Sequence, residues 1–339
     1  MINMQAELPL EQRQARGPAA LAGLKTIAMA GEQGATAKAM AVIAGVRDHL
    51  MQISVDIEQL EPLQPEQVAL QVLAVNNDPQ WRERILRGMT LVALFDGEPC
   101  AAQLQLLQRA ATAFGVANDP VNSYRQVMER QLLPIRLDIA RRGFIGQTVG
   151  ASLRQEGART ALAIARVLLG QSDKQMAEHY KTLRSYPEGS FGRAYAHFID
   201  RNGFPFPGEV GGPPPPVMRH DCCHVLGGYG TTAQEEGAVL GFQAGFERLD
   251  PFYVLMFALA EFELGIGASP TIPGESDQLD VERIFAGIAH GRLVNANLIA
   301  DVDPWDHFKE PLDAVRERFN VQPRGREAIY PASPSEANG

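Results

Sequence analysis

The sequence has few cysteines. Only three occur in 339 residues, two of them are adjacent, and none belongs to a CxxC pair. This leaves no disulfide framework, which is the usual device of small secreted proteins. The first residues, MINMQAELPLEQRQARG, also lack a continuous apolar core behind a basic start, so we expect no secretory leader. Both absences predict a cytoplasmic protein.

The sequence is also poor in positive charge. Its formal net charge is −9 at pH 7, and no basic run carries interleaved aromatic residues. Because an acidic surface repels phosphate groups, nucleic acid is not an expected partner.

Long apolar runs are missing as well. The best candidate, FYVLMFALAEFELGIGA at residues 252–268, is interrupted by Glu261 and Glu263. A membrane-spanning helix needs about 20 largely apolar residues, so we expect none here. Residues 252–266 predict either a buried core helix or a helix that lies in a membrane interface or lines an apolar pocket.

Alternating strand patterns are nearly absent, whereas helical periodicity is frequent. Met40, Ile43, Val46 and Leu50 recur three or four positions apart, which is typical of one helix face. Similar spacings predict helices around residues 85–92, 104–114, 132–139, 159–169, 173–184, 191–201, 233–247, 251–265, 279–297 and 311–319. The pattern as a whole predicts an all-α fold.

Breaks in these patterns indicate two helical domains. The stretch GVANDPVNSY interrupts the first group of helices, and a boundary is expected between residues 120 and 155. We expect a helical bundle at 20–145, followed by a multi-helix domain at 150–325. The segments at 1–19 and 326–339 are expected to be flexible.

A short acidic turn separates two helices of the first domain. Asp96, Gly97 and Glu98 follow one apolar helix pattern and precede the next. This order of helix, Asp-Gly-Glu turn and helix resembles that of TerB-like helical domains. A structural turn is favoured over a metal site, because such turns are common.

The most informative stretch is RHDCCHVLGGYGTTAQEEGAVLGF at residues 219–242. In a helix that begins near Met218, His220 and His224 lie four positions apart and share one face, with Asp221 at its edge. The GGYG sequence then ends this helix, because glycine accepts the left-handed conformation of a helix C-terminus.

A second helix is expected directly after this turn. Thr232 and Glu235 have the spacing of a capping box, which places Glu236 in the first turn of the new helix. Two imidazoles with carboxylates suit zinc, iron, manganese or cobalt, and few protein ligands leave positions open for water or substrate. The candidate ligands of one divalent metal ion, with zinc as the first choice, are His220, Asp221, His224 and Glu236.

Several neighbouring groups have a simpler interpretation. Cys222 and Cys223 point away from the histidine face, because consecutive helix residues are about 100° apart, and are interpreted as small buried hydrophobes. Glu235 is interpreted as a capping residue. The other histidines are interpreted as structural or exposed: His49, His179, His197, His290 and His307.

The longer pattern HD-x2-H-x11-E, from His220 to Glu236, resembles the metal motif of the Coq4 family of ubiquinone biosynthesis. Residues 186–204, YPEGSFGRAYAHFIDRNGF, are similar to the family's segment before the motif. Residues 287–321, GIAHGRLVNANLIADVDPWDHFKEPLDAVRERFNV, are similar to its C-terminal end. The sequence departs from the family in the two cysteines inside the motif, where bulky residues are common, and in its additional N-terminal half.

The resemblance implies an all-helical, metal-dependent carbon–carbon lyase. The expected reaction removes the C1 carboxyl group from a polyprenylated hydroxybenzoate, with or without coupled hydroxylation. The resemblance also implies a peripheral position on the inner face of the membrane, other quinone-biosynthesis proteins as partners, and a homo-oligomer. Arg193 is a candidate to pair with the substrate carboxylate, with helix packing or capping as the alternative, and Tyr195 is interpreted as a core residue.

Two other classes of function stay open from the sequence. The protein could be a non-catalytic scaffold or prenyl-lipid carrier, in which a metal ion only braces two helices. It could instead be a stress-response binding module whose function lies in the TerB-like domain.

Overall fold

The fold is all-α, as the sequence predicts. The computed structural model describes residues 9–75, 79–142, 171–247, 251–267 and 274–324. These residues form helices and no β-strand. Within the same ranges, no helix combines the length and the apolar character that crossing a lipid bilayer requires. The helix expected at 159–169 lies outside the described residues.

The chain divides into two compact units. The first combines Met1–Asp138 with Leu259–Ala286, and the second combines Ile139–Ala258 with Gly287–Gly339. The expected domain ends at residues 145 and 150 lie outside the described part of the chain, as does the expected tail at 326–339.

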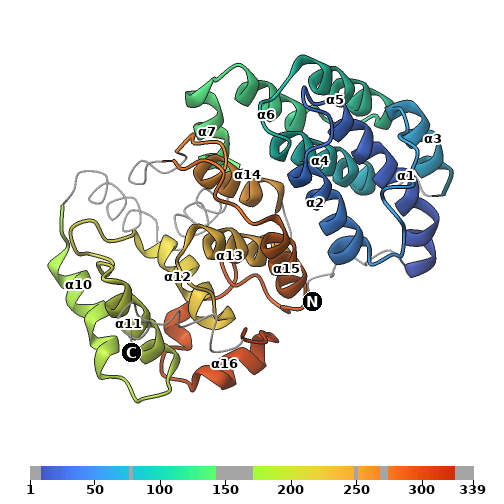
Figure 1. Cartoon of the computed structure of the whole chain (residues 1–339). Coiled ribbons are helices and arrows are strands. Elements are labelled where there is room, and N and C mark those ends of the chain that lie inside the picture. Colours follow the sequence, from blue (N-terminus) through green and yellow to red (C-terminus); the bar gives the residue numbers. More distant parts are fainter. Residues whose placement is uncertain (1–8, 76–78, 143–170, 248–250, 268–273, 325–339) are drawn as a thin grey trace, which may run out of the picture. The chain divides into compact units, whose positions relative to one another are not determined.

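The first unit is a helical bundle (Figure 1). Its helices are α1 (Leu10–Met29), α2 (Ala37–Gly45) continued by a π-helix (Val46–Met51), α3 (Pro65–Val75), α4 (Pro79–Phe95), α5 (Ala101–Phe114), α6 (Asp119–Met128) and most of α7 (Leu132–Arg142). Helix α1 packs against α3 and α4, and α3 packs against α5. The apolar side chains of Leu21, Ile27, Ile43 and Phe114 are fully buried between these helices.

Helix α1 extends further toward the N-terminus than expected. The sequence predicts a flexible segment at 1–19, but the helix begins at Leu10 and buries Arg16. Ile53 lies so near Gly17 that a Cβ atom at that glycine would overlap its side chain. The helix escapes a search for hydrophobic periodicity, because small residues rather than a stripe of large ones make this contact.

The break after α5 is shorter than the sequence stretch 115–124 suggests. Gly115 ends α5 in the left-handed conformation, with φ 61°. Helix α6 then begins at Asp119 and takes Pro120 into its first turn. Proline is accepted there because its missing N–H would have no partner within the helix.

A segment from the second half of the sequence completes the first unit. Within Leu259–Ala286, Glu263 and Asp277 both form ion pairs with Lys38 of α2. The expectation of one contiguous domain at 150–325 does not anticipate this exchange, because the pairing joins residues more than 200 positions apart.

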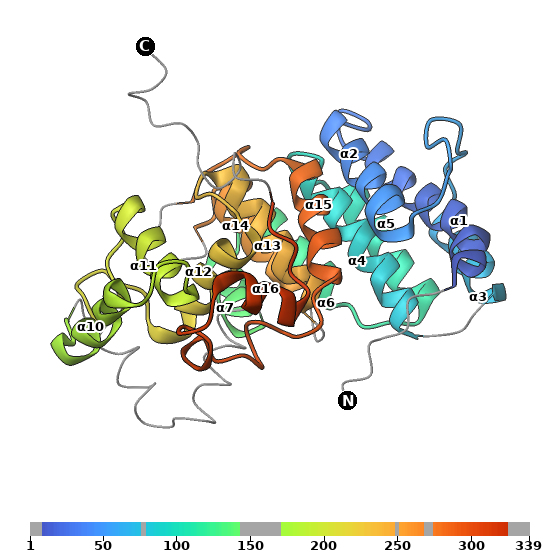
Figure 2. The same cartoon turned by 90° about the horizontal axis from the view of Figure 1, so that it is seen from below.

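The second unit carries the remaining helices. These are α10 (Lys174–Lys181), α11 (Phe191–Asn202), α12 (Pro215–Gly227), α13 (Ala233–Phe246) and α16 (Leu312–Phe319), with 3-10 turns at Thr182–Ser185 and Pro304–Asp306. Helices α14 (Pro251–Phe262) and α15 (Val281–Arg292) each cross the division between the units. Figures 1 and 2 both show α12 between α11 and α13, which it contacts.

Aromatic side chains fill the core of the second unit. Tyr195, Phe206, Phe242 and Phe308 are fully buried there. The rings of Tyr195 and Phe308 stack with their centroids 5.7 Å apart. This core holds α11, α12 and α13 together, so it also supports the residues predicted to bind metal.

The apolar stretch predicted at 252–266 is a core helix in its first part. In α14 the side chains of Phe252, Val254 and Met256 are at most 2 % exposed. Of the two interpretations of this stretch, the structure supports the buried core helix.

Helix α12 begins earlier than expected. The sequence predicts a helix start near Met218, but the helix starts at Pro215 with proline in its first turn. The first-turn N–H groups of a helix have no helical acceptor, so proline loses no hydrogen bond there. The earlier start adds a turn before His220.

Glycines allow α13 and α15 to approach closely within the second unit. A Cβ atom at Gly287 would overlap the carbonyl oxygen of Ala238, and one at Gly291 would overlap that of Phe242. Because these are backbone atoms of the neighbouring helix, they cannot move aside as a flexible side chain would. The contact fixes α13, which carries Glu236.

We predict that Gly291→Ala destabilises the protein. The new methyl group forces α13 and α15 apart, which should lower the free energy of unfolding by about 1–3 kcal/mol or more. Gly88→Ala is the matched control: it also lies inside a helix, but its nearest neighbour would be 3.8 Å from the new Cβ atom. It should raise stability by up to about 1 kcal/mol. Chemical denaturation followed by circular dichroism measures both, and equal effects would contradict the close contact.

Candidate metal centre

Helix α12 presents two histidines on one face. His220 and His224 are four positions apart, and their Nε2 atoms lie 3.1 Å from each other. The four-residue spacing nearly equals one helical turn of 3.6 residues, so both side chains project in nearly the same direction.

Helix α13 brings a carboxylate to the same point. The Oε2 atom of Glu236 lies 3.2 Å from Nε2 of His220, and its Oε1 atom lies 3.5 Å from Nε2 of His224. One ligand atom from each of the three residues lies within 4.8 Å of the other two. The structure therefore brings together three of the four predicted metal ligands.

The turn between α12 and α13 has the predicted form. Gly228 ends α12 in the left-handed conformation, with φ 76°. Thr232 caps α13, and its side chain accepts a hydrogen bond from the backbone N–H of Glu235. The turn reverses the chain, which sets Glu236 opposite the two histidines.

Asp221, the fourth predicted ligand, is not part of the converging group. It follows His220 directly in α12, so its side chain leaves the helix about 100° away from that of the histidine. Burial raises the pKa of its carboxyl group to about 6, although the nearby His220 and His224 oppose this shift. Asp221 lies near enough to affect both histidines through its charge. Its direct ligation of a metal ion stays a prediction.

The backbone fixes the orientation of His224. Its Nδ1 atom lies 2.8 Å from the carbonyl oxygen of Gly230, so Nδ1–H is the donor. Nε2 is then left with a lone pair that points toward His220 and Glu236. A metal-binding histidine usually donates its other N–H in this way, which holds the ring and selects the tautomer.

Gln243 orients His220 and was missed from the sequence. Its side-chain amide lies 2.8 Å from Nδ1 of His220, and its Oε1 atom is buried without a partner. Turning the amide by 180° leaves its shape unchanged and lets Oε1 accept the Nδ1–H. Gln243 lies seven positions after Glu236, which puts both on one face of α13, and that spacing was the available signal.

The cluster is sheltered from solvent. The side chain of His224 is 2 % exposed, that of His220 is 13 % exposed, and that of Glu236 is 21 % exposed. The ring of Phe198 stacks on His224, with centroids 5.3 Å apart and planes 27° apart. Phe198 therefore closes one side of the site.

Burial and charge act in opposite directions on these groups. Burial alone would raise the pKa of Glu236, but His224 and His220 outweigh it and hold the pKa well below its usual range. Burial would lower the pKa of His224, but the charge of Glu236 and its hydrogen bond raise it overall. A sheltered carboxylate beside two imidazoles favours a positive charge at their centre, either a proton on a ring nitrogen or a metal ion.

The donor atoms fit a divalent cation. An ion about 2.0–2.2 Å from each donor, as for zinc with imidazole and carboxylate ligands, requires donors roughly 3 to 3.5 Å apart. The two Nε2 atoms are 3.1 Å apart, while Oε2 of Glu236 lies 3.2 Å from that of His220 and Oε1 lies 3.5 Å from that of His224. With one donor atom from each residue, all separations stay within 4.8 Å. Three protein ligands leave at least one coordination position for water or substrate.

The residues interpreted as bystanders lie outside the cluster. Cys222 and Cys223 are buried in the core of the second unit, where Sγ of Cys222 lies 3.3 Å from Sδ of Met218. Burial raises the pKa of the Cys223 thiol to about 12, so it stays protonated. Glu235 accepts a hydrogen bond from the backbone N–H of Gly230, two residues before the N-cap Thr232, rather than from Thr232 itself as a capping box would have it.

Arg193 lies near the start of α11 and forms an ion pair. Its Nε atom is 3.3 Å from Oε2 of Glu188, and its side chain is 29 % exposed. Its predicted contact with a substrate carboxylate stays a prediction. Tyr195, two positions later, is fully buried, which confirms its interpretation as a core residue.

Most of the other histidines have structural contacts. His49 pairs with Glu282 and His307 pairs with Glu310, while His290 accepts or donates a hydrogen bond with Tyr229. His179 stacks on Trp305 with ring centroids 4.1 Å apart.

The acidic turn of the first unit is structural. Oδ1 of Asp96 accepts hydrogen bonds from the backbone N–H and the hydroxyl group of Thr36, at 3.2 and 2.9 Å. Its Oδ2 atom accepts one from Gln103 at 2.7 Å. The carboxylate therefore ties the start of α2 to α5, as the preferred interpretation expected.

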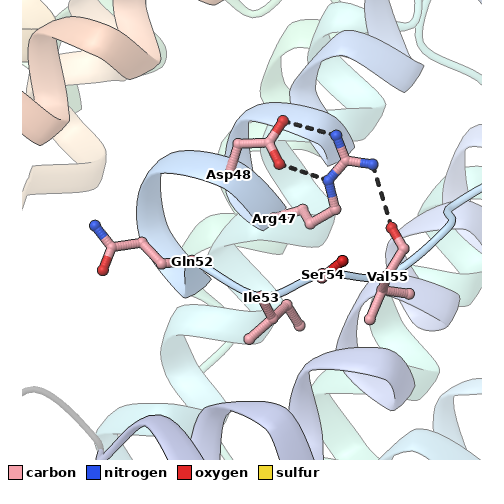
Figure 3. A pocket seen from close by; sticks show the side chains of 6 residues that line it. All are labelled: Arg47, Asp48, Gln52, Ile53, Ser54 and Val55. Carbon is pink, nitrogen blue, oxygen red and sulfur yellow. Dashed lines mark hydrogen bonds and ion pairs between the residues drawn. The ribbon is translucent and has the colours of Figure 1, made fainter.

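A surface hollow of about 490 Å³ lies in the first unit. Figure 3 shows that Arg47 closes one side by binding Asp48 and the carbonyl oxygen of Val55. Gln52, Ile53 and Ser54 also line the hollow. Because its charged groups already pair with each other, the hollow offers little to a ligand.

Comparison of the chain with protein-family models, with curated proteins and with solved structures gave no match. The resemblances to the Coq4 family and to TerB-like domains therefore stay predictions.

We predict that His224→Ala removes the metal. The variant loses one of three donor atoms, so its metal content should fall from stoichiometric to background while its helix content persists. Elemental analysis of protein purified without a metal-affinity tag measures this. The control is the double variant Cys222→Ala with Cys223→Ala, which should keep its metal. Full metal content in the first variant, or loss of metal in the second, would contradict the site.

We also predict that metal affinity falls as the pH is lowered. A metal ion binds the neutral imidazole, so each protonated histidine must first release its proton. Because Glu236 raises the pKa of His224, protons compete at a higher pH than for an ordinary histidine with a pKa of about 6.5. Below that pKa, affinity should fall about tenfold per pH unit for each competing proton. Zinc titrations against a competing chelator between about pH 5 and pH 8 test this, and a constant affinity would contradict it.

Proposed function

We propose that the protein binds one divalent metal ion through His220, His224 and Glu236 and works as a metal-dependent enzyme. The observation that carries the proposal is the convergence of these three side chains from two helices. Zinc is the first choice, because two imidazoles and a carboxylate are a common zinc set with an open position; iron, manganese and cobalt are the alternatives.

The sequence resemblance to the Coq4 family supports a specific reaction. We infer that the protein is a carbon–carbon lyase of ubiquinone biosynthesis. In this reaction the bond between C1 and the carboxyl group of a polyprenylated hydroxybenzoate breaks, the carboxyl group leaves as CO2, and a proton takes its place at C1. In the version with coupled hydroxylation, dioxygen is the oxidant and supplies the hydroxyl oxygen at C1. A bound divalent cation would act as a Lewis acid on the phenol and carboxylate oxygens of such a substrate.

The residues around the cluster suit this role. Glu236 and the Nε2 atoms of the two histidines supply donors of fixed orientation, since Gly230 and Gln243 hold the opposite ring nitrogens. The ring of Phe198 covers His224 and limits access of bulk water from its side. Site groups held by packing and hydrogen bonds need little reorganisation during a reaction.

A substrate with a prenyl tail is held by a membrane, which requires contact with the bilayer. Phe204 and Val210, on the segment that leads to α12, are 42 % and 68 % exposed. The ring of Phe204 lies 6.0 Å from that of Phe198, which covers His224. These exposed apolar side chains support a peripheral position on the inner face of the membrane. The same proposal includes other quinone-biosynthesis proteins as binding partners and assembly of the protein into a homo-oligomer.

We predict that Glu236→Ala, or deletion of the gene, lowers ubiquinone and accumulates a carboxylated polyprenyl-phenol precursor. The step before the proposed reaction would continue, so its product collects. The strain must lack any separate decarboxylase for this carboxyl group, and mass spectrometry of lipid extracts measures both compounds. The control is the double variant Cys222→Ala with Cys223→Ala, which should complement the deletion. Normal quinone without the precursor would refute the biosynthetic proposal.

The second candidate is a metal-braced scaffold or prenyl-lipid carrier without catalysis. The deep burial of His224, which is 2 % exposed, favours it, because structural metal sites are closed. Cobalt(II)-substituted protein distinguishes the two. An open site should change its visible absorption when azide is added, whereas a closed four-ligand site should not. A carrier would also slow several biosynthetic steps without accumulation of a single carboxylated intermediate.

A further inference from the structure

The C-terminal end of α12 is capped by distant residues. The last four carbonyl groups of a helix lack partners within the helix. Here Arg316 of α16 donates to the carbonyl oxygens of Val225 and Leu226, each at 3.0 Å. The backbone N–H of Arg324 donates to the carbonyl oxygen of Gly227, also at 3.0 Å. The helix that carries both histidines is thus held at its end by residues about 90 positions later.

The side chain of Arg324 reaches further, into the turn after α12. Its Nη1 atom donates to Oε2 of Glu235 at 2.7 Å. Its guanidinium carbon lies 4.9 Å from the centre of the Tyr229 ring, the arrangement of a cation–π contact. Arg324 therefore contacts both ends of the Gly228–Thr232 turn.

The same carboxylate atom continues the contact to the metal cluster. Oε2 of Glu235 also accepts the backbone N–H of Gly230 at 3.2 Å. The carbonyl oxygen of Gly230 in turn accepts Nδ1–H of His224 at 2.8 Å. A chain of three contacts thus joins the guanidinium group of Arg324 to the ring of a proposed metal ligand.

We propose that Arg324 is a positioning residue of the metal centre, an inference that rests on the metal site proposed above. It fixes Glu235, and through it Gly230, so that the Gly230 carbonyl keeps His224 in the tautomer that offers Nε2. The Glu235 side chain is 9 % exposed, and a pair that is largely removed from water is screened less than a surface pair. Loss of Arg324 removes this ion pair, so the turn is held less firmly.

The test measures metal affinity and coordination in full-length variants. Arg324→Ala should weaken zinc binding by roughly 10- to 100-fold, the range for loss of a group that orients a ligand. It should also change the visible absorption of the cobalt(II) protein, since the histidine ring is no longer held. Arg324→Lys, which keeps a cation beside Glu235, should restore most of the affinity. Arg318→Ala is the matched control, because Arg318 pairs with Glu310 at the surface of the same segment.

A double-mutant cycle separates positioning from general stability. Glu235→Gln removes the charge that Arg324 pairs with, so Arg324→Ala should weaken zinc binding much less in that background than in the wild type. A purely structural role would lower the melting temperature of the variants but leave zinc affinity and the cobalt spectrum unchanged, and that result overturns the proposal. If Arg324→Ala does not fold, the zinc affinities of Arg324→Lys and Glu235→Gln are compared with that of the wild type. Affinity near the wild-type value in Arg324→Lys and lower affinity in Glu235→Gln support the proposal, and equal affinity in all three overturns it.

The two proposals fail in distinguishable ways. Wild-type protein that binds neither zinc nor cobalt refutes the metal site, and the positioning role falls with it. Wild-type protein that binds zinc, beside an Arg324→Ala variant of equal affinity, refutes the positioning role alone.

Discussion

The negative charge of Glu236 is the constraint around which the second unit is arranged. A carboxylate that is largely withdrawn from water costs free energy unless positive charge or hydrogen-bond donors compensate it. Its oxygens lie 3.2 and 3.5 Å from the ring nitrogens of His220 and His224. Each of these rings is held on its opposite side by a hydrogen bond, that of His224 to the carbonyl oxygen of Gly230 and that of His220 to the side chain of Gln243. If α12 and α13 separated, the Glu236 carboxylate would lose the histidine ring nitrogens that compensate its charge.

Helix α13 combines two tasks on different faces. One face presents Glu236 and Gln243 toward α12, and the other lets Gly287 and Gly291 of α15 approach its backbone. Close packing of this kind leaves little freedom for the helix to slide or rotate. Accurate placement of a ligand on α13 therefore depends on residues far from the site in the sequence. The packing of the core behind the site thus determines where Glu236 and Gln243 lie.

Local signals made much of the candidate site predictable. Gly228 and Thr232 mark a helix end and a helix start through backbone conformation and capping alone, which do not depend on the rest of the fold. The spacing of His220 and His224 follows from the helical repeat. The sequence did not indicate that Asp221 would lie outside the group of converging ligand atoms, because a motif in one dimension does not distinguish a ligand from a charge that acts through space.

The contacts that were missed all depend on tertiary structure. Gln243 binds His220 only because α13 crosses α12 at a particular angle, and Arg324 reaches Glu235 across 89 positions. The start of α1 at Leu10 depends on small residues that pack against Ile53. The side-chain pattern within one helix does not predict which distant residues that helix contacts.

The exchange of Leu259–Ala286 between the halves of the chain affects the order in which the protein can fold during synthesis. Domains usually fold one after another as they leave the ribosome. Here the first unit lacks part of its structure until Ala286 has been made. By then the ribosome has already passed both histidines and Glu236. The first unit can therefore complete its packing only after residues 139–258 of the second unit have been made.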